Sequence, residues 1–230
     1  MAGRRSYSPS RSKRKPIMTI DDTIVFIVDD DDALREALGE LLASNGVRSV
    51  PFSSAGEYIG SSKPDLPACL ILDVELPDIN GLELQRQIAQ GDHPPIVFIT
   101  GHGDIPSSVR AIKHGAVDFL TKPFSDTALL LAIRSAIAQD RETRAKRAEL
   151  TLLKQRYHEL SPRERDVLPL VVSGLLNKQA AAELGISEVT LQIHRRNVMH
   201  KMAASSLADL VRIAERLEIP IQHSRRMGGI

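Results

Sequence analysis

The fold is decided by residues 25–30, which read VFIVDD, so that four apolar residues run directly into two acidic ones. Three later segments repeat this pattern of a short apolar run with a polar residue at its carboxyl end: CLIL before Asp73, IVFI before Thr100, and DFLT before Lys122. Short apolar runs predict buried strands, and helical patterns between them favour a parallel sheet. The carboxyl ends of parallel strands meet at one edge, which is where open α/β sheets bind ligands.

Three carboxylates gather at that predicted edge, from Asp29, Asp30 and Asp73. Carboxylates held close together repel one another. A divalent cation with a preference for oxygen ligands removes that repulsion. The sequence therefore predicts a cation site among these three aspartates.

The alternation of apolar runs and helical patterns predicts an α/β fold in which five strands and five helices form a doubly wound parallel sheet. The second strand is expected at 47–50. Each expected helix has an apolar face of its own. These helices include residues 34–42, 81–89 and 105–112, and a further helix begins near Ser125. After residue 138 that last helix becomes polar on all sides.

A second, all-helical region follows, and it opens with a specific helix-start signal. Ser161, Pro162 and Glu164 form a capping box with proline at the first helical position. Two short helices are then expected at 178–184 and 188–202. A glycine-containing turn joins them, and the second is basic, which is typical of a DNA-binding helix-turn-helix. A final helix at 207–217 completes a four-helix unit.

Composition is compatible with two modest domains, because the chain has 230 residues, 42% of them apolar. Cys69 is the only cysteine, so an intrachain disulfide and a cysteine metal site are excluded, and a buried thiol is expected. No apolar run approaches the ~18–20 residues of a membrane span. These features predict a protein of the reducing cytoplasm without membrane contact.

The net charge of +1 conceals a separation of charge along the chain. Residues 1–16 are basic, residues 17–125 are acidic, and residues 161–230 are mildly basic. This distribution indicates two tasks: an acidic half that holds a cation and a basic half that meets a polyanion. The basic start of the chain is expected to be disordered, either as an arm that touches DNA or as an inert extension.

The chain resembles two families joined in series. Residues 24–138 resemble a response-regulator receiver domain, with a flavodoxin-like fold, through Asp29-Asp30, Asp73, the Leu76-Pro77-x-x-Asn80-Gly81 turn, Thr100, Phe119 and Lys122-Pro123. Residues 157–219 resemble the LuxR-type helix-turn-helix. The pairing looks like the FixJ subgroup of two-component transcription regulators.

The resemblance implies five segments: a disordered basic tail (1–20), a receiver domain (21–138), a helical linker (139–156), a LuxR-type DNA-binding domain (157–222) and a C-terminal tail (223–230). Apolar residues in the linker region at 150, 153, 157 and 160 leave two interpretations open. They belong either to a solvated linker or to a short dimerising coiled coil.

The resemblance also implies a phosphorylation site with Asp73 as the acceptor. Mg²⁺ would be held by Asp29, Asp30, Asp73 and the main-chain carbonyl of Glu75. Thr100 and Lys122 would bind phosphoryl oxygens, and the Lys122–Pro123 peptide is expected to be cis. The implied partners are a sensor histidine kinase, double-stranded operator DNA, RNA polymerase and, after phosphorylation, a second copy of the chain.

A switch is implied by Thr100 and Phe119. Movement of Thr100 towards a phosphoryl group would let the Phe119 ring rotate inward and change the surface formed by the fourth helix and the fifth strand. The resemblance implies that this surface dimerises. A simple core role for Phe119 remains the alternative. His102 lies near the site and is expected to be an ordinary loop histidine.

The predicted recognition helix supplies the expected DNA contacts. Gln192 and Ile193 are expected to reach base edges, and the remaining predicted DNA-binding residues are Lys178, Thr190, His194, Arg195, Arg196 and Lys201. Gln192 stands where relatives often carry Lys or Glu, and glutamine suits bidentate contact with adenine. Glu75 also departs from the family pattern by adding a carboxylate beside the metal.

Two rival functions follow from the same residues. A haloacid-dehalogenase-like phosphatase also uses a strand-end aspartate with Mg²⁺, but its Asp-x-Asp motif is missing after Asp73. A receiver that acts only through protein contacts is the other rival. The helix-turn-helix half of the chain argues against both and favours a regulator rather than an enzyme.

Overall fold

The computed structural model describes residues 23–89, 91–101 and 105–220, with the main chain alone at 105–108. The predicted N-terminal tail (1–20), the C-terminal tail (223–230) and His102 lie outside the described residues. The chain divides into two compact units, and the boundary falls between Glu142 and Thr143. None of the described helices combines the length and apolar character that crossing a membrane requires.

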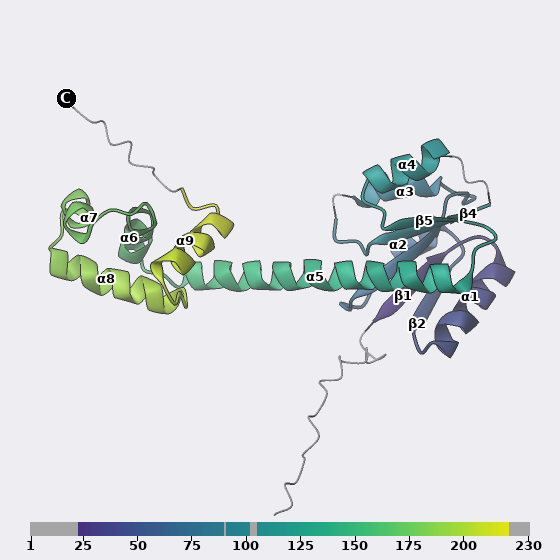
Figure 1. Ribbon diagram of the computed structural model, residues 1–230, viewed down its shortest axis with the longest axis horizontal. Helices are drawn as coiled ribbons and strands as arrows, with labels where there is room; N and C mark the ends of the chain where they lie inside the picture. Colours follow the sequence, from purple (N-terminus) through teal and green to yellow (C-terminus); the bar gives the residue numbers. More distant parts are fainter. Residues whose placement is uncertain (1–22, 90, 102–104, 221–230) are drawn as a thin grey trace, which may run out of the picture. The chain divides into compact units, whose positions relative to one another are not determined.

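The first unit is a five-stranded parallel sheet, as predicted (Figure 1). Its strand order is β2-β1-β3-β4-β5. The strands are β1 (Ile24–Val28), β2 (Arg48–Phe52), β3 (Ala68–Asp73), β4 (Ile96–Thr100) and β5 (Asp118–Thr121). The helices are α1 (Asp32–Ser44), α2 (Ala55–Gly60), α3 (Gly81–Ile88), α4 (Ile105–Lys113) and α5 (Asp126–His158). The predicted doubly wound fold is confirmed.

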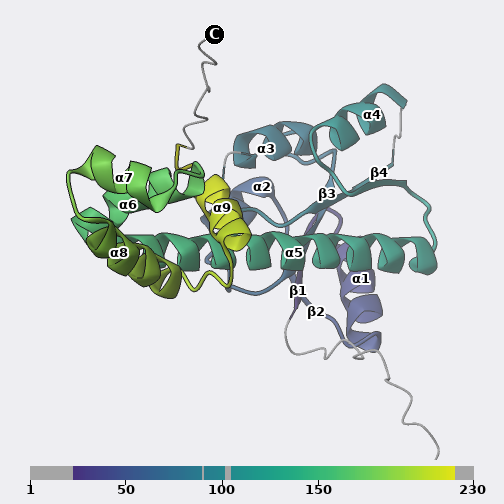
Figure 2. The same ribbon diagram turned by 60° about the vertical axis from the view of Figure 1, so that its left-hand side comes forward.

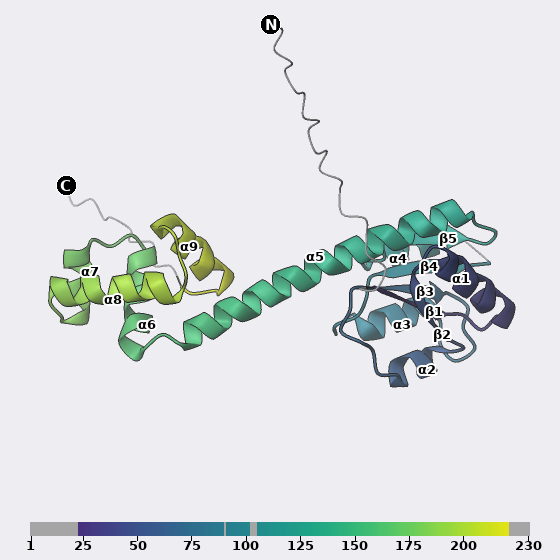
Figure 3. The same ribbon diagram turned by 90° about the horizontal axis from the view of Figure 1, so that it is seen from below.

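Alternate residues of each buried strand face opposite sides of the sheet, and a separate apolar core forms on each side. One core joins Val25 and Ile27 to apolar residues of α1 and α5. The other joins Phe26 and Phe98 to α2, α3 and α4. Figure 3 shows α5 on one side of the sheet and α2 and α3 on the other. Cys69 is fully buried in the first of these cores, as predicted.

The second strand extends further than the sequence predicted, because β2 continues through Pro51 to Phe52. Proline lacks an N–H group and is tolerated only where that group would face solvent. Strand β2 lies at the edge of the sheet, and Pro51 is exposed there while pairing with Ile27. The edge position explains why proline did not end the strand.

In the described part of the second unit, four helices follow α5, and Figure 2 shows them close together. These are α6 (Pro162–Val172), α7 (Asn177–Leu184), α8 (Glu188–Lys201) and α9 (Leu207–Arg216). The predicted capping box at Ser161 is present. Gly185 ends α7 with a φ of 64°, a left-handed conformation that glycine adopts easily. The predicted helix-turn-helix arrangement is therefore observed in α7 and α8.

Helix α5 is one continuous helix that passes through the boundary between the two units. Its first half buries Leu129 and Ile133 against the sheet. Near its end, Leu153 and Tyr157 pack with Leu160 in the core of the second unit. Packing within one chain therefore explains the apolar residues at 153, 157 and 160, for which a dimerising coiled coil was the other interpretation.

Candidate functional site

The strand ends bring three carboxylates and one lysine together. Asp29 is fully buried after β1, Asp73 is almost buried at the end of β3, and Asp30 is exposed. One ligand oxygen of each of these aspartates lies within 4.8 Å of the others. The Lys122 Nζ donates to Asp29 Oδ2 at 2.9 Å and to Asp73 Oδ2 at 2.6 Å.

Burial and charge act in opposite directions on these groups. Desolvation by burial raises the pKa of Asp29, and the bond from Lys122 only partly offsets that rise. Burial alone would lower the pKa of Lys122, but its bonds to Asp73 and Asp29 outweigh that effect and raise the pKa. Lys122 therefore stays charged, and a single lysine faces three carboxylates.

This donor set fits a hard divalent cation. Carboxylate oxygens are the ligands that Mg²⁺ and Ca²⁺ prefer, and a cation supplies the positive charge that one lysine does not. The Glu75 side chain is exposed, while its N–H group donates to Asp73 Oδ1 at 3.0 Å. That bond holds the main chain at Glu75 beside the predicted acceptor.

Gly81 allows the chain to return close to β3 after the loop. A Cβ atom at this position would lie 2.3 Å from the main-chain oxygen of Asp73, a distance that no side chain can accept. The Gly81 N–H group donates to the Val74 carbonyl at 2.9 Å. The Asn80-Gly81 turn identified in the sequence therefore has a steric reason in the structure.

Thr100 and Lys122 are connected through the main chain of β4 and β5. Thr100 is fully buried at the end of β4, and its carbonyl accepts the Lys122 N–H group at 2.8 Å. The Lys122–Pro123 peptide is cis, as predicted. The half-buried Phe119 ring lies 6.0 Å from the Phe98 ring, centroid to centroid. This ring contact is compatible with a core role for Phe119. The switch role of Phe119 stays a prediction.

A second candidate site is the exposed face of α8. Gln192, Ile193 and Arg196 all lie on that face, and 55% of Ile193 is exposed. Thr190 is half-buried instead, and its hydroxyl forms a hydrogen bond with the hydroxyl of the N-cap Ser187 at 2.8 Å. The structure thus brings three of the predicted contact residues to one solvent-facing stripe.

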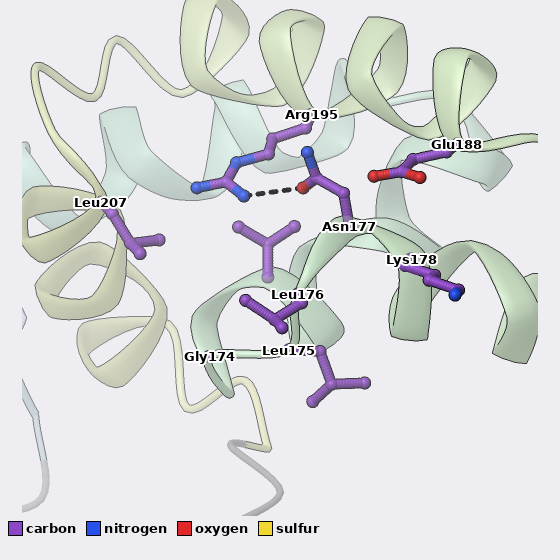
Figure 4. Close-up of a pocket in the computed structure, with 9 residues that line it drawn as sticks. Gly174, Leu175, Leu176, Asn177, Lys178, Glu188, Arg195 and Leu207 are labelled. Carbon is purple, nitrogen blue, oxygen red and sulfur yellow. Dashed lines mark hydrogen bonds between the residues drawn. The ribbon is translucent and has the colours of Figure 1, made fainter.

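The other predicted DNA-binding residues lie off this stripe. Lys178 on α7 is exposed. The Arg195 guanidinium donates to Asn177 Oδ1 at 2.9 Å, at the rim of the pocket drawn in Figure 4. The pocket measures ≈ 460 Å³ and is lined by leucine and valine side chains together with Asn177, Lys178, Glu188 and Arg195. His194 is half-buried, and its Nδ1 is buried with no hydrogen-bond partner in the described part of the chain.

Lys201 is engaged within the second unit. Its Nζ forms an ion pair with Glu164 Oε2 at 2.7 Å and donates to the Glu159 carbonyl at 3.2 Å. The Glu164 side chain is only 5% exposed, whereas that of Lys201 is 35% exposed. Phosphate contact by Lys201 stays a prediction, while its contact with the α6 carboxylate is part of the fold.

Sequence reasoning missed three residues of the α8 stripe: Val189, Asn197 and His200. All three are exposed, and they lie three or four positions from Gln192, Ile193 or Arg196. Residues at this spacing share one helix face. The spacing of these residues in the sequence is therefore the signal that would have identified them.

Comparison with known proteins gives two family matches. The model of the response regulator receiver domain matches residues 25–134. The model of the bacterial regulatory proteins of the luxR family matches residues 158–214. Together they cover both candidate sites, the carboxylate cluster and helix α8.

Individual relatives are similar to this chain over most of their length. Nodulation protein W of Bradyrhizobium diazoefficiens is 50% identical over 88% of this chain and 90% of its own. The transcriptional regulatory protein FixJ of Azorhizobium caulinodans is 43% identical over 83% and 90%. Among solved structures, the response regulator StyR has a TM-score of 0.75 with 46% identity, covering 85% of this chain and 99% of that one.

Proposed function

This chain belongs to the response regulators of transcription that join a receiver domain to a LuxR-type DNA-binding domain, and we propose that a sensor histidine kinase switches it by phosphorylating Asp73. Proteins of this family regulate transcription and are not enzymes. The observation that carries the proposal is the contact of Lys122 Nζ with the carboxylates of both Asp73 and Asp29.

The proposed reaction is a phosphoryl transfer to a carboxylate. An Oδ atom of Asp73 attacks phosphorus, and the bond between phosphorus and the kinase histidine nitrogen breaks, so an acyl phosphate forms on Asp73. Such transfer depends on in-line positioning and on neutralising the charge of the phosphoryl oxygens. Lys122 neutralises one phosphoryl oxygen, and the Thr100 hydroxyl donates a hydrogen bond to another.

Mg²⁺ is the cation that we assign to the carboxylate cluster. Asp29, Asp30 and Asp73 would hold it together with the Glu75 carbonyl. When bound, Mg²⁺ neutralises negative charge on the phosphoryl group. The side chain of Glu75 lies outside this ligand set, and its added charge would affect the lifetime of the acyl phosphate.

Phosphorylation should convert the protein into a dimer. The proposed contact surface is the face of α4 and β5, where α4 exposes Val109 and Ile112 at 45% and 46%. These two apolar side chains lie one helical turn apart and suit a contact between copies. New charge at Asp73 would act on this surface through Thr100 and Phe119. Light scattering should therefore give the mass of a dimer after treatment with acetyl phosphate and Mg²⁺. The same mass before and after treatment would refute the mechanism.

Dimerisation would deliver two α8 helices to one operator. Linked binding of two modules raises affinity by roughly 10²–10⁴-fold over one, which lets phosphorylation control occupancy of DNA. RNA polymerase is the proposed downstream partner, and binding to bacterial operators places the function in the cytoplasm. Genomic footprinting of the wild-type protein against the Asp73→Asn variant tests the proposal: sites occupied only by wild type support it.

Gln192→Ala should weaken binding to the cognate site by about 1–3 kcal/mol and relax preference at one base position. The reason is that Gln192 is exposed on the α8 stripe, and glutamine recognises adenine through two hydrogen bonds. Lys178→Ala serves as the contrast, because an exposed lysine that meets phosphate should weaken all sequences alike and flatten the salt slope by about one. Titrations on specific and scrambled duplexes at several salt concentrations separate the two. Equal losses on both duplexes for Gln192→Ala would contradict major-groove placement of α8.

A further inference from the structure

The loop between β3 and α3, residues 74–80, carries the main chain of Glu75 and is fixed at both ends. At its start, the Val74 N–H group donates to the Ile99 carbonyl at 3.2 Å. At its end, the Gly81 N–H group returns to the Val74 carbonyl at 2.9 Å. Between these points the Glu75 N–H group donates to Asp73 Oδ1, and Leu76 and Ile79 pack against the core below the loop. The remaining question is what ties the loop to the neighbouring element α2.

Asp78 provides this tie by bonding to the first turn of α2. Its Oδ2 accepts the Gly56 N–H group at 2.8 Å, and its Oδ1 accepts the Ala55 N–H group at 3.3 Å. The first N–H groups of a helix have no partner within the helix, so a carboxylate is well suited to them. The backbone bond from Gly56 is the main reason that the pKa of Asp78 is lowered.

The partner segment is itself firmly held. Ala55 and Tyr58 of α2 are buried in the core on that side of the sheet. The Phe52 carbonyl just before α2 accepts the Asp29 N–H group at 3.3 Å. The end of β2 is therefore bonded to the main chain of Asp29, and the first turn of α2, three residues later, is bonded to Asp78.

We propose that Asp78 is a positioning residue that ties the β3–α3 loop to α2 and thereby holds Glu75 and Asp73 in the geometry that binds a divalent cation. It touches neither the cation nor the phosphoryl group. The inference rests on the proposed function, because it gives Asp78 a role in the cation site assigned there. Residues that orient metal ligands typically change metal affinity by 10–100-fold when they are removed.

Ser54 offers a matched control for a purely structural role. Its Oγ accepts the Glu57 N–H group at 3.2 Å and caps the same end of α2. Ser54→Ala removes a cap from α2 but leaves the β3–α3 loop untouched. Asp78→Ala removes a cap and releases the loop. Asp78→Asn keeps one acceptor oxygen and should recover part of the affinity.

The experiment is a calorimetric titration of the full-length chain with Mg²⁺ alone. Asp78→Ala should weaken Mg²⁺ binding roughly 10-fold, Asp78→Asn should fall between it and wild type, and Ser54→Ala should match wild type. Phosphorylation of Asp78→Ala by acetyl phosphate should approach the wild-type rate once Mg²⁺ is saturating. This recovery distinguishes weaker cation binding from loss of the acceptor.

Two other results overturn the proposal. If Asp78→Ala and Ser54→Ala weaken Mg²⁺ binding equally, Asp78 acts only as a helix cap. If Asp78→Ala binds Mg²⁺ as wild type does, the loop needs no support from α2. In both cases the proposed function stands, provided that the wild-type chain binds Mg²⁺ and is phosphorylated; failure of the wild type in those assays would refute the function itself.

Discussion

Asp73→Asn protein should take up no phosphoryl group from acetyl phosphate or carbamoyl phosphate with Mg²⁺, under conditions in which the wild-type chain is labelled. The amide of asparagine cannot form an acyl phosphate, because it lacks the carboxylate oxygen that attacks phosphorus. The substitution keeps the shape of the side chain, so the Glu75 N–H group retains an acceptor at this position. Intact-mass spectrometry measures the added phosphoryl group directly.

Asp118→Asn is a matched control for this experiment. Asp118 lies at the amino end of β5, whereas Asp73 lies at the carboxyl end of β3. The Asp118 Oδ1 accepts the Phe119 N–H group at 2.8 Å. Asparagine keeps that acceptor, so the control should be labelled like wild type. Equal labelling of Asp73→Asn and wild type would show that another residue accepts the phosphoryl group.

The strand-end site was predictable because each strand carries its functional residue at the same end. In a parallel sheet, adjacent strands end at one edge, so Asp29, Asp73 and Thr100 meet whatever lies between them in the chain. The observed register agrees with this reasoning, since Val28 pairs with Leu72 and Asp73 pairs with Ile99. Fold and carboxylate cluster therefore followed from local patterns alone.

Helix α2 shows where the sequence reasoning stopped. The segment from Ser54 to Glu57 has the spacing of a capping box, yet a helix of only six residues has too little periodicity to be recognised. Its contact with Asp78 joins residues 22 positions apart. Such a pairing depends on how two loops approach one another, which no local pattern encodes.

Lys201 illustrates a different limit. A basic residue near the end of a recognition helix suggests phosphate contact, because exposed lysines commonly bind DNA in this way. The structure instead places its ammonium group against Glu164 of α6. Only the packing of α8 against α6 reveals that the charge has a partner within the fold.

Lys201→Met should destabilise the second unit by about 2 kcal/mol at neutral pH. Removing one partner of a fully buried ion pair costs ~3–5 kcal/mol because the other charge is left without compensation. The expected value here is lower, since the Lys201 side chain is 35% exposed and solvent screens the pair. Lys178→Met on the exposed surface of α7 should leave stability nearly unchanged and controls for the loss of charge.

The effect should depend on pH in a defined direction. Burial alone would raise the pKa of Glu164, but its bonds to Lys201 and Ser161 outweigh burial and lower the pKa to about 2, from an ordinary value of 4.5. A carboxylate with a lowered pKa stabilises the folded state above its unfolded pKa, and this stabilisation is lost as the pH falls through the folded value. The stability difference between wild type and Lys201→Met should thus be greatest above pH 4.5 and shrink towards pH 2.

Hydrogen exchange of the α6 main chain, followed as a function of pH, measures this difference within the second unit. Amides of buried residues such as Val167 and Val171 exchange through opening of that unit. Exchange should be faster in Lys201→Met than in Lys178→Met at neutral pH, and the two rates should converge in acid. This result would show that Lys201 stabilises the fold. Wild-type exchange in Lys201→Met, together with a salt slope of DNA binding flattened by about one unit, would instead assign the lysine to phosphate.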